Sequence, residues 1–395
     1  MHEKGITVAI AALKGLGLFA IFKMKRFIGD RRKPRSPATR KTFAPSCIAA
    51  FLWLTLSPAA SAAQAQSAIA DIAKQFDSHP LIMIGELHRS TEIHAFLQQM
   101  LRDPAFICRA DDIVVEFGNS RLQPLANTYA SGGNVTQIQL QSLWRETAVP
   151  LTWNSPLYQQ FYETVRDINQ KHLCTHSIRV VLGDPPLDWS KIKTVKDYAQ
   201  VTDRDGSYAD VVEREVLSKH HRALLVAGEL HAMKQLPKDY QSEPDEPTVA
   251  QLIERKHPGA LFSIVSVPLP NAAKALKLGP APSFSVVRGS ALEHADFQFT
   301  DYDSTVTLVS VNGKQVWKLK PEKHWPPMGH VVDGLLYVGG NHSLYPSPTI
   351  YLDTAYQQEL RRRALIIKNY SGQDFMPGID ELVKEGKAIE KNSHQ

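Results

Sequence analysis

The chain has 395 residues, enough to bury a sizeable core in one to three domains. Its 45 Lys and Arg residues against 40 Asp and Glu give a formal net charge of +5. Residues 1–62 carry 11 of the basic and 2 of the acidic side chains, which leaves 34 against 38, a net charge of −4, for the remainder. The basic balance therefore belongs to the N-terminal segment and indicates neither a nucleic-acid partner nor a membrane-surface partner.

The N-terminal segment has the pattern of a secretory signal peptide. Basic residues at 33–41 precede an apolar run at 47–56, which leads into small residues at 57–65. The run is shorter than the roughly 20 apolar residues that cross a bilayer, although an uncleaved anchor is the alternative. We expect residues 1–62 to be removed and the chain to be exported to the periplasm or the outside. The membrane would be contacted only through an uncleaved leader.

Two cysteines, Cys108 and Cys174, remain after the leader. An oxidising compartment would allow them to pair, but sequence alone does not show that they are close. A disulfide and two separately buried thiols both stay open. The chain has no Cys-x-x-Cys motif and no Cys/His spacing typical of zinc.

Between the leader and residue 230, short apolar runs alternate with segments of helical periodicity. The predicted strands are 81–85, 112–115, 178–183 and 223–228, and the predicted helices are 63–77, 90–101, 120–130, 135–147, 156–171 and 208–221. Such alternation favours an α/β fold, with a mostly parallel central sheet flanked by helices on both faces.

The C-terminal part continues this pattern and adds an extension. A helix at 248–256, a strand at 261–267, a returning strand at 334–339 and a helix at 354–367 are predicted. Alternating residues at 305–319 around Asn312-Gly313 predict a β-hairpin. We therefore divide the chain into an α/β domain at 63–270, a linker and β-hairpin insertion at 271–330, and a C-terminal strand and helices at 331–395 that complete the domain.

Each of the first four apolar runs is followed at once by a carboxylate, and these are Glu86, Glu116, Asp184 and Glu229. Because the carboxyl ends of parallel strands meet at one edge of a sheet, the four acids are expected to converge there. Ligands of open α/β sheets bind at that edge. The pattern therefore predicts a functional site.

The tetrapeptide Gly-Glu-Leu-His occurs twice, at 85–88 and 228–231. In extended backbone, side chains two apart point to one side, so each Glu is expected to share a cleft with its His. Imidazoles with several carboxylates suit a divalent metal such as manganese, iron or zinc, or a metal-free hydrolysis in which His is the general base. The predicted catalytic residues are Glu86, His88, Glu116, Glu229 and His231, and a metal would be held by Glu86, His88 and His231.

Three further residues are candidates for substrate binding. His94 could reach the site from the first turns of its helix, or lie on the helix surface. Arg121 could bind a substrate carboxylate or phosphate, or form a simple ion pair, and Asp184 belongs to the set of strand-end acids. The absence of Gly-x-Ser-x-Gly, Walker, Gly-x-Gly-x-x-Gly and His-Glu-x-x-His motifs disfavours a serine hydrolase, a nucleotide-binding protein and a zincin.

Segments 84–88, 114–123 and 226–231, together with His94, resemble the ChaN-like haem-uptake proteins of the Tiki/TraB and erythromycin-esterase superfamily. The resemblance covers about 81–267. It implies that Glu86 and His88 are catalytic residues or ligands, that Glu116 is the acid after the second strand, and that His231 is the late histidine. The chain departs from the ChaN-like pattern in its second Gly-Glu-x-His and its long C-terminal extension, and no haem-ligating Tyr is assigned.

Members of that group include metal-dependent proteases, antibiotic esterases and dimeric haem binders, so the resemblance does not settle an activity. It implies an exported hydrolase with a small-molecule or peptide substrate. The alternative is an uptake protein that binds haem or a metal without turnover, and a homodimer is among the implied assemblies. A third hypothesis is a non-catalytic relative that binds a partner.

Overall fold

The structure is a computed structural model that describes residues 58–201, 203–237, 247–267, 270–295, 297, 306–311, 314–319, 325–340 and 348–393. Residues 1–57 of the predicted leader therefore lie outside the described residues. Among the helices that are described, none is both long and apolar enough to cross a bilayer.

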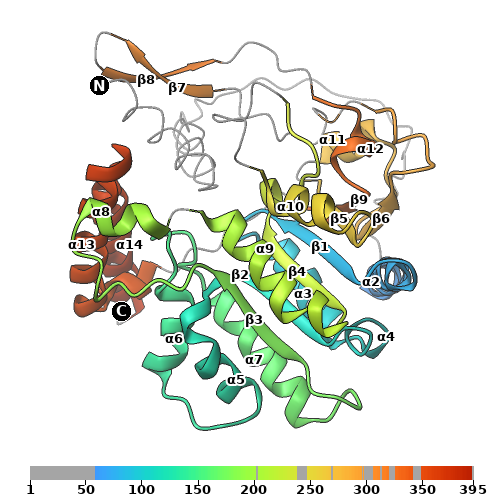
Figure 1. The fold of residues 1–395 in the computed structure, drawn as a ribbon, viewed down its shortest axis with the longest axis horizontal. Coiled ribbons are helices and arrows are strands. Elements are labelled where there is room, and N and C mark those ends of the chain that lie inside the picture. The colour runs from blue at the N-terminus through green and yellow to red at the C-terminus, as the bar shows by residue number, and fades with distance from the viewer. Residues whose placement is uncertain are drawn as a thin grey trace, which may run out of the picture.

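A seven-stranded sheet forms the centre of the molecule (Figure 1). Its strand order is β3-β2-β4-β1-β5-β9-β6. The bounds are β1 Leu81–Glu86, β2 Asp112–Asn119, β3 Arg179–Asp184, β4 Ala223–Gly228, β5 Leu261–Ser266, β6 Ser283–Val286 and β9 Gly334–Tyr337. All neighbouring strands run parallel except β6 and β9, which confirms the predicted mostly parallel α/β fold.

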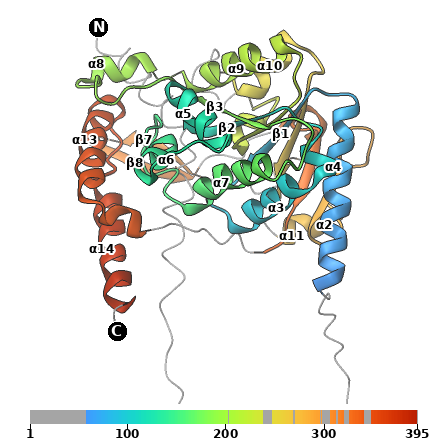
Figure 2. The same ribbon diagram turned by 90° about the horizontal axis from the view of Figure 1, so that it is seen from below.

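Helices cover both faces of this sheet, and Figure 2 shows α3 and α7 on one side with α9 and α10 on the other. The longer helices are α2 Pro58–Ala73, α3 Thr91–Arg102, α5 Gln123–Ala130, α6 Gln137–Arg145, α7 Pro156–Gln170, α9 Arg204–Glu215, α10 Val249–Lys256, α13 Thr354–Ser371 and α14 Met376–Ser393. Short helices are α4 Pro104–Ile107, α8 Val195–Tyr198, α11 Pro270–Ala275 and α12 Met328–Val331.

Side-chain caps explain where several helices begin. The oxygens of Ser90, Ser155 and Thr248 accept backbone N–H groups at the first turns of α3, α7 and α10. Each satisfies a donor that has no partner within the helix. Asp203 does the same for α9 by accepting from Gly206, so this helix begins at Arg204 and not at the predicted position 208.

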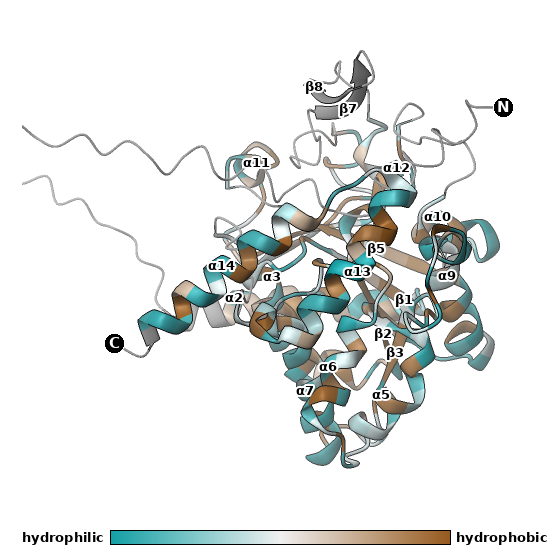
Figure 3. Ribbon diagram, turned by 90° about the vertical axis from the view of Figure 1, so that its left-hand side faces the viewer, coloured by the Kyte–Doolittle hydropathy of each residue, from teal (hydrophilic) through white to brown (hydrophobic). Residues whose placement is uncertain are grey.

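Alternation along the strands divides the core into two layers. Ile82 and Ile84 of β1 pack against α3 and α7, whereas Leu81 and Met83 pack on the face of α9 and α10. Successive strand side chains point to opposite faces, and here both faces are buried. In Figure 3 the strands are accordingly brown, while much of the helical surface is teal.

The C-terminal elements extend this arrangement. The predicted return strand is present as β9, which pairs parallel with β5. The segment predicted as a linker and insertion contains β6, which pairs antiparallel with β9 at the edge of the main sheet. The hairpin strands are β7 Val306–Val311 and β8 Lys314–Leu319, and the predicted turn Asn312-Gly313 lies outside the described residues.

Helices α13 and α14 lie at the opposite end of the molecule from α2 (Figures 1 and 2). Their apolar side chains form a third core with the segments 148–151 and 187–198. These segments precede α7 and follow β3, and both leave the carboxyl edge of the sheet. The C-terminal helices therefore support the loops beside the candidate site.

Candidate functional site

The four strands that end in carboxylates are neighbours in the sheet, in the order β3-β2-β4-β1. Their parallel register places Glu86 opposite Gly228, the residue before Glu229. The four carboxylates are buried. The structure thus brings the four predicted strand-end acids to one edge.

The acids of β1 and β2 nevertheless leave the sheet on opposite faces. Glu86 continues the series of Ile82 and Ile84 toward α3 and α7. Glu116 continues the series of Val114 toward α9 and α10. Side chains along a strand alternate between the two faces of the sheet. Even-numbered residues of β1 face α3 and α7, whereas even-numbered residues of β2 face α9 and α10. Two clusters result, one around Glu86 and one around Glu116.

In the first cluster, Glu86 lies among two imidazoles and a phenol. Its Oε1 is 3.1 Å from Nδ1 of His88, and its Oε2 is 2.5 Å from Nε2 of His94. The Tyr158 hydroxyl donates to Oε1 at 3.2 Å and accepts from the backbone N–H of Arg89 at 2.9 Å. Burial raises the pKa of Glu86, but His94 and His88 outweigh it and the pKa is lowered. The buried carboxylate is therefore ionised.

His88 presents its second ring nitrogen to the edge of the sheet. Its side chain is 12% exposed, and its ring meets that of Trp153 edge-on at 4.6 Å between centroids. A Cβ on Gly228 would lie 2.9 Å from Nε2, so the ring sits directly against this glycine. In the part of the chain that is described, Nε2 has no hydrogen-bond partner. It is available to a ligand.

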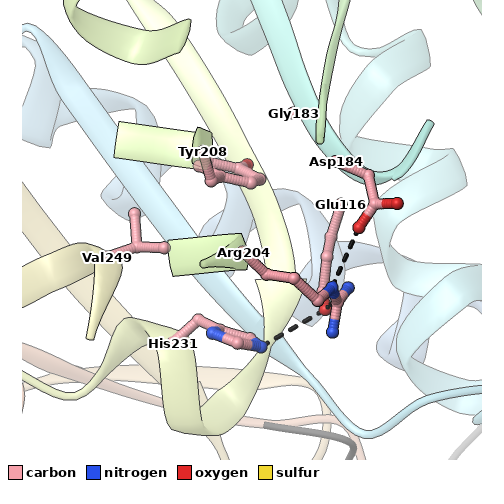
Figure 4. A pocket seen from close by; sticks show the side chains of 7 residues that line it. All are labelled: Glu116, Gly183, Asp184, Arg204, Tyr208, His231 and Val249. Carbon is pink, nitrogen blue, oxygen red and sulfur yellow. Dashed lines mark hydrogen bonds and ion pairs between the residues drawn. The ribbon is translucent and has the colours of Figure 1, made fainter. Parts of the chain in front are cut away.

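The second cluster, drawn in Figure 4, is built on Glu116. Arg204 lies 2.7 Å from its Oε1 and donates through Nε to Asp184 at 2.9 Å. The backbone N–H of Gly228 donates to Oε2 at 2.7 Å. Burial raises the pKa of Glu116, but His231 and Arg204 hold it well below its usual range. Burial dominates at Asp184 and raises its pKa.

His231 lies between two carboxylates. Its Nδ1 is 2.7 Å from Asp205 and its Nε2 is 3.2 Å from Glu116. Burial lowers the pKa of His231, but the two carboxylates outweigh it and raise the pKa to about 10. The ring is therefore an imidazolium at neutral pH. It borders a small cavity with room for about one water molecule, which Glu116, Asp184 and Arg204 also line.

The backbone at the second Gly-Glu-Leu-His differs from expectation. Residues Glu229–Ala232 form a short 3-10 helix, η7, so the predicted extended backbone is wrong here. Glu229 accepts a hydrogen bond from the Ser266 hydroxyl on β5, whereas His231 turns toward Glu116. The two side chains therefore have different partners. The two Gly-Glu-Leu-His copies therefore share their sequence but not their backbone conformation.

The predicted substrate-binding residues lie in three settings. His94 is fully buried in α3, against Glu86. Asp184 is buried as well and accepts the backbone N–H of Ala148 at 2.5 Å. Arg121 is exposed and donates through Nε to the Leu187 carbonyl at 3.1 Å. His94 and Asp184 are thus occupied by contacts within the protein, and Arg121 is held at the surface by a backbone carbonyl.

Sequence reasoning missed three members of the two clusters. Arg204 and Asp205 occupy the first turn of α9, which the prediction began four residues too late. The Thr202-Asp203 pair before them is a helix-start signal that could have placed this turn. Tyr158 lies on α7, 72 residues from Glu86, and no local pattern reveals that contact.

The side chains as placed do not fit the predicted metal set. Among the described residues, no three His, Cys, Asp or Glu side chains are arranged to hold a metal ion. Both ring nitrogens of His231 face carboxylates, so this residue has no lone pair to offer. His94 is fully buried against Glu86 and is equally unsuited to ligate haem iron.

No protein-family model matches this sequence, and the comparison with curated proteins found no match. Two solved structures are similar to it. A protein from Bacillus cereus has 10% identity and a TM-score of 0.45, over 68% of this chain and 90% of its own. A succinoglycan biosynthesis protein has 9% identity and a TM-score of 0.40, over 71% of this chain and 97% of its own. Neither likeness bears on the function of this chain.

Proposed function

We propose that this chain is a hydrolase related to the ChaN, Tiki and erythromycin-esterase proteins, with His88 as its general base. One observation carries the proposal. The Nδ1 of His88 lies 3.1 Å from the buried carboxylate of Glu86, while its Nε2 is free beside Gly228. A base whose outer nitrogen is open and whose inner nitrogen is held by a carboxylate suits the activation of water.

The reaction follows from these contacts. Nε2 of His88 removes a proton from water, and the resulting hydroxide attacks the carbonyl carbon of a carboxylic ester. The ionised Glu86 stabilises the imidazolium that forms and keeps its ring in place, and Tyr158 fixes Glu86 by donating to Oε1. The tetrahedral intermediate then collapses with cleavage of the ester C–O bond. The imidazolium returns its proton to the leaving alcohol.

The second cluster lies close to this base and holds two cations, each paired with carboxylates. His231 and Arg204 are cationic, and the Cδ2 of His231 approaches the same glycine on which His88 rests, at 3.5 Å from a Cβ at Gly228. Fixed and oriented ion pairs beside the reacting centre, with their cationic ends toward the substrate, would stabilise negative charge that develops on the substrate oxygen. Glu116 holds both cations in position, as a positioning residue.

Replacement of His88 tests the general base. We expect His88→Ala to lower kcat on p-nitrophenyl carboxylic esters by about 10²- to 10⁴-fold, the usual contribution of a general base. His176→Ala removes a histidine that binds only the Ala110 carbonyl and should leave kcat unchanged. Circular dichroism of both variants checks the fold. Full activity of His88→Ala, or no turnover of any ester by the wild type, contradicts the proposal.

We also propose that the chain works outside the cytoplasm. The leader pattern supports this, and so does the disulfide between Cys108 and Cys174, because such bonds persist mainly in oxidising compartments. N-terminal sequencing of the protein recovered from the periplasm or medium should begin near residue 63. Recovery of the uncleaved chain in the cytoplasm, with both thiols free, would refute export.

A further inference from the structure

Arg89, the residue after His88, is a buried cation with which no carboxylate of the described residues pairs. It is 7% exposed, and its Nη1 makes one long hydrogen bond, 3.4 Å, to the side-chain oxygen of Asn154. Its Nε has no partner, and none of the carboxylates in the described residues pairs with it. A charge removed from water in this way is costly unless another charge compensates it.

Other arginines near the site show the usual solution. Arg204 pairs with Glu116 and Asp184. Arg363, which is 2% exposed, pairs with Glu146 and Glu359, both at 2.7 Å. Arg89 differs from both, because no acid among the described residues pairs with it, and a bound anion could supply the compensating charge.

The groups around Arg89 also lack partners. Asn154 and Tyr351 are buried next to each other, and the Asn154 side chain works against the rise in the pKa of Tyr351 that burial causes. Beyond this contact, the amide nitrogen of Asn154 and the hydroxyl of Tyr351 have no well-formed hydrogen bond among the described residues. The indole N–H of Trp153, whose ring packs on His88, is unpaired as well. Most buried polar groups in proteins are satisfied, so buried donors without a well-formed hydrogen bond favour an acceptor from a ligand.

The backbone holds Arg89 in this position. Its φ is +66°, in the left-handed region that residues with a side chain seldom adopt. The backbone N–H donates to Tyr158, the same hydroxyl that binds Glu86. Strained residues of this kind concentrate at functional sites, and this one is coupled directly to the proposed base.

We propose that Arg89, together with Asn154 and Tyr351, binds an anionic oxygen group of the substrate, a carboxylate or a phosphate. This inference rests on the proposed hydrolase, since it places the anionic group next to the bond that His88 attacks. The planar guanidinium matches both kinds of group in a two-point contact. Arg121, the arginine that the sequence favours for this task, donates to a backbone carbonyl at the surface.

Anion binding can be measured without catalysis. We expect inorganic phosphate or acetate to raise the Tm of the whole chain more than chloride at equal ionic strength, and calorimetry to give a Kd for the better anion. The preference between phosphate and acetate separates a phosphate-bearing substrate from a carboxylate-bearing one. Arg89→Met should weaken that binding at least tenfold, whereas Arg121→Met should leave it unchanged.

Stability without an anion provides a second readout. Because Arg89 is uncompensated, Arg89→Met should have a Tm equal to or above that of the wild type in anion-free buffer. The matched variant Arg363→Met removes the ion pair of Glu146 and one of the two that Glu359 makes, and should lower the Tm. A purely structural role for Arg89 predicts a lower Tm for both. If Arg89→Met does not fold, Arg89→Lys keeps the charge without the fork and should bind the anion more weakly.

The outcomes separate this inference from the proposed function. His88→Ala should bind the anion as the wild type does, while losing turnover. Normal ester hydrolysis by His88→Ala, with anion binding intact, would overturn the general base alone. A wild type that does not distinguish phosphate and acetate from chloride, or an Arg89→Met protein with undiminished binding, would overturn the anion site.

Discussion

Gly228 sets the spacing between the two site histidines. A methyl group at this position would come within 2.9 Å of Cε1 and Nε2 of His88, closer than real Cβ contacts. Gly228→Ala should therefore displace the base and lower kcat at least tenfold, with a smaller effect on stability. Gly279→Ala, whose new methyl would have its nearest neighbour at 3.4 Å, is the control in ester hydrolysis and urea unfolding. Equal activity of both variants would contradict the placement of His88.

His231 makes the stability of the folded chain depend on pH. Its pKa rises from 6.5 to about 10 on folding, so the folded chain binds a proton that the unfolded chain has released between these values. The stabilisation is complete below pH 6.5 and is lost as the pH rises toward 10, by up to about 1.4 kcal/mol per pH unit. Urea unfolding at pH 6.5, 8 and 9.5 measures this fall.

A variant isolates the contribution of that imidazolium. His231→Gln should be less stable than the wild type at pH 6.5, and its stability should change less between pH 6.5 and 9.5. His176→Gln leaves the Glu116 cluster intact and should retain the wild-type slope. An unchanged slope in His231→Gln would show that the ring is not charged in the folded state.

At the residue scale, the sequence predicts what is local. Glu86 is the last residue of an apolar strand and His88 lies in the turn directly after it, so their contact is local although the backbone between them is not the predicted extended one. The surroundings of Arg204 and Arg89 could not be predicted in this way. Arg204 pairs with Glu116 and Arg89 contacts Asn154, and in both cases the neighbour comes from a chain segment distant in sequence. The charge state of His231 could not be predicted either, because it needs Asp205 and Glu116 at known distances.

At the scale of elements, the strands were predictable and their order was not. Apolar runs that end in acids reveal β1 to β4, but nothing local shows that β4 inserts between β1 and β2. The short edge strand β6 directly follows the Pro- and Ala-rich stretch at 268–282 and was not predicted. The turn after Gly228 was missed because the second tetrapeptide is identical in sequence to the first. The strand order, the edge strand and this turn all depend on tertiary contacts, which no local pattern in the sequence reveals.

The disulfide ties the C-terminal end of α4 to the loop after α7. Cys108 and Cys174 are 66 residues apart, and closing a loop of that length stabilises a fold by about 4 kcal/mol in the chain-entropy view. The double variant Cys108→Ser/Cys174→Ser should lose stability of this order in urea unfolding. Wild type treated with a reductant should behave in the same way. A loss below about 1 kcal/mol would mean that other contacts hold these elements together.

At the scale of the whole molecule, α13 and α14 support one side of the site. Leu360 of α13 is fully buried in the core that includes Ala148, whose backbone N–H binds Asp184. Leu360→Ala should cost about 2–5 kcal/mol of stability and raise KM by loosening this loop. Leu365→Ala on the same helix removes a side chain that is 52% exposed and should change neither quantity appreciably. Equal effects of the two variants would argue against this support.

A second molecule-wide prediction concerns cofactors. The acid–base route needs no metal, so dialysis against EDTA should leave ester hydrolysis unchanged, and elemental analysis of the active protein should show no stoichiometric metal. Adding haemin should produce no saturable Soret band. Activity that EDTA abolishes and zinc or manganese restores would contradict the route. A one-to-one Soret band, lost on replacing a site histidine, would favour the uptake function instead.

The exit of Glu86 and Glu116 through opposite faces of the sheet has a consequence for how such a protein can change. The base belongs to the layer of α3 and α7, and its cationic neighbours belong to the layer of α9 and η7. Mutations that tilt α9 can retune the charge beside the reacting bond while the base is inherited intact. The base and the cationic cluster can therefore be altered separately. Selection for new substrates should first produce substitutions in only one of the two helical layers.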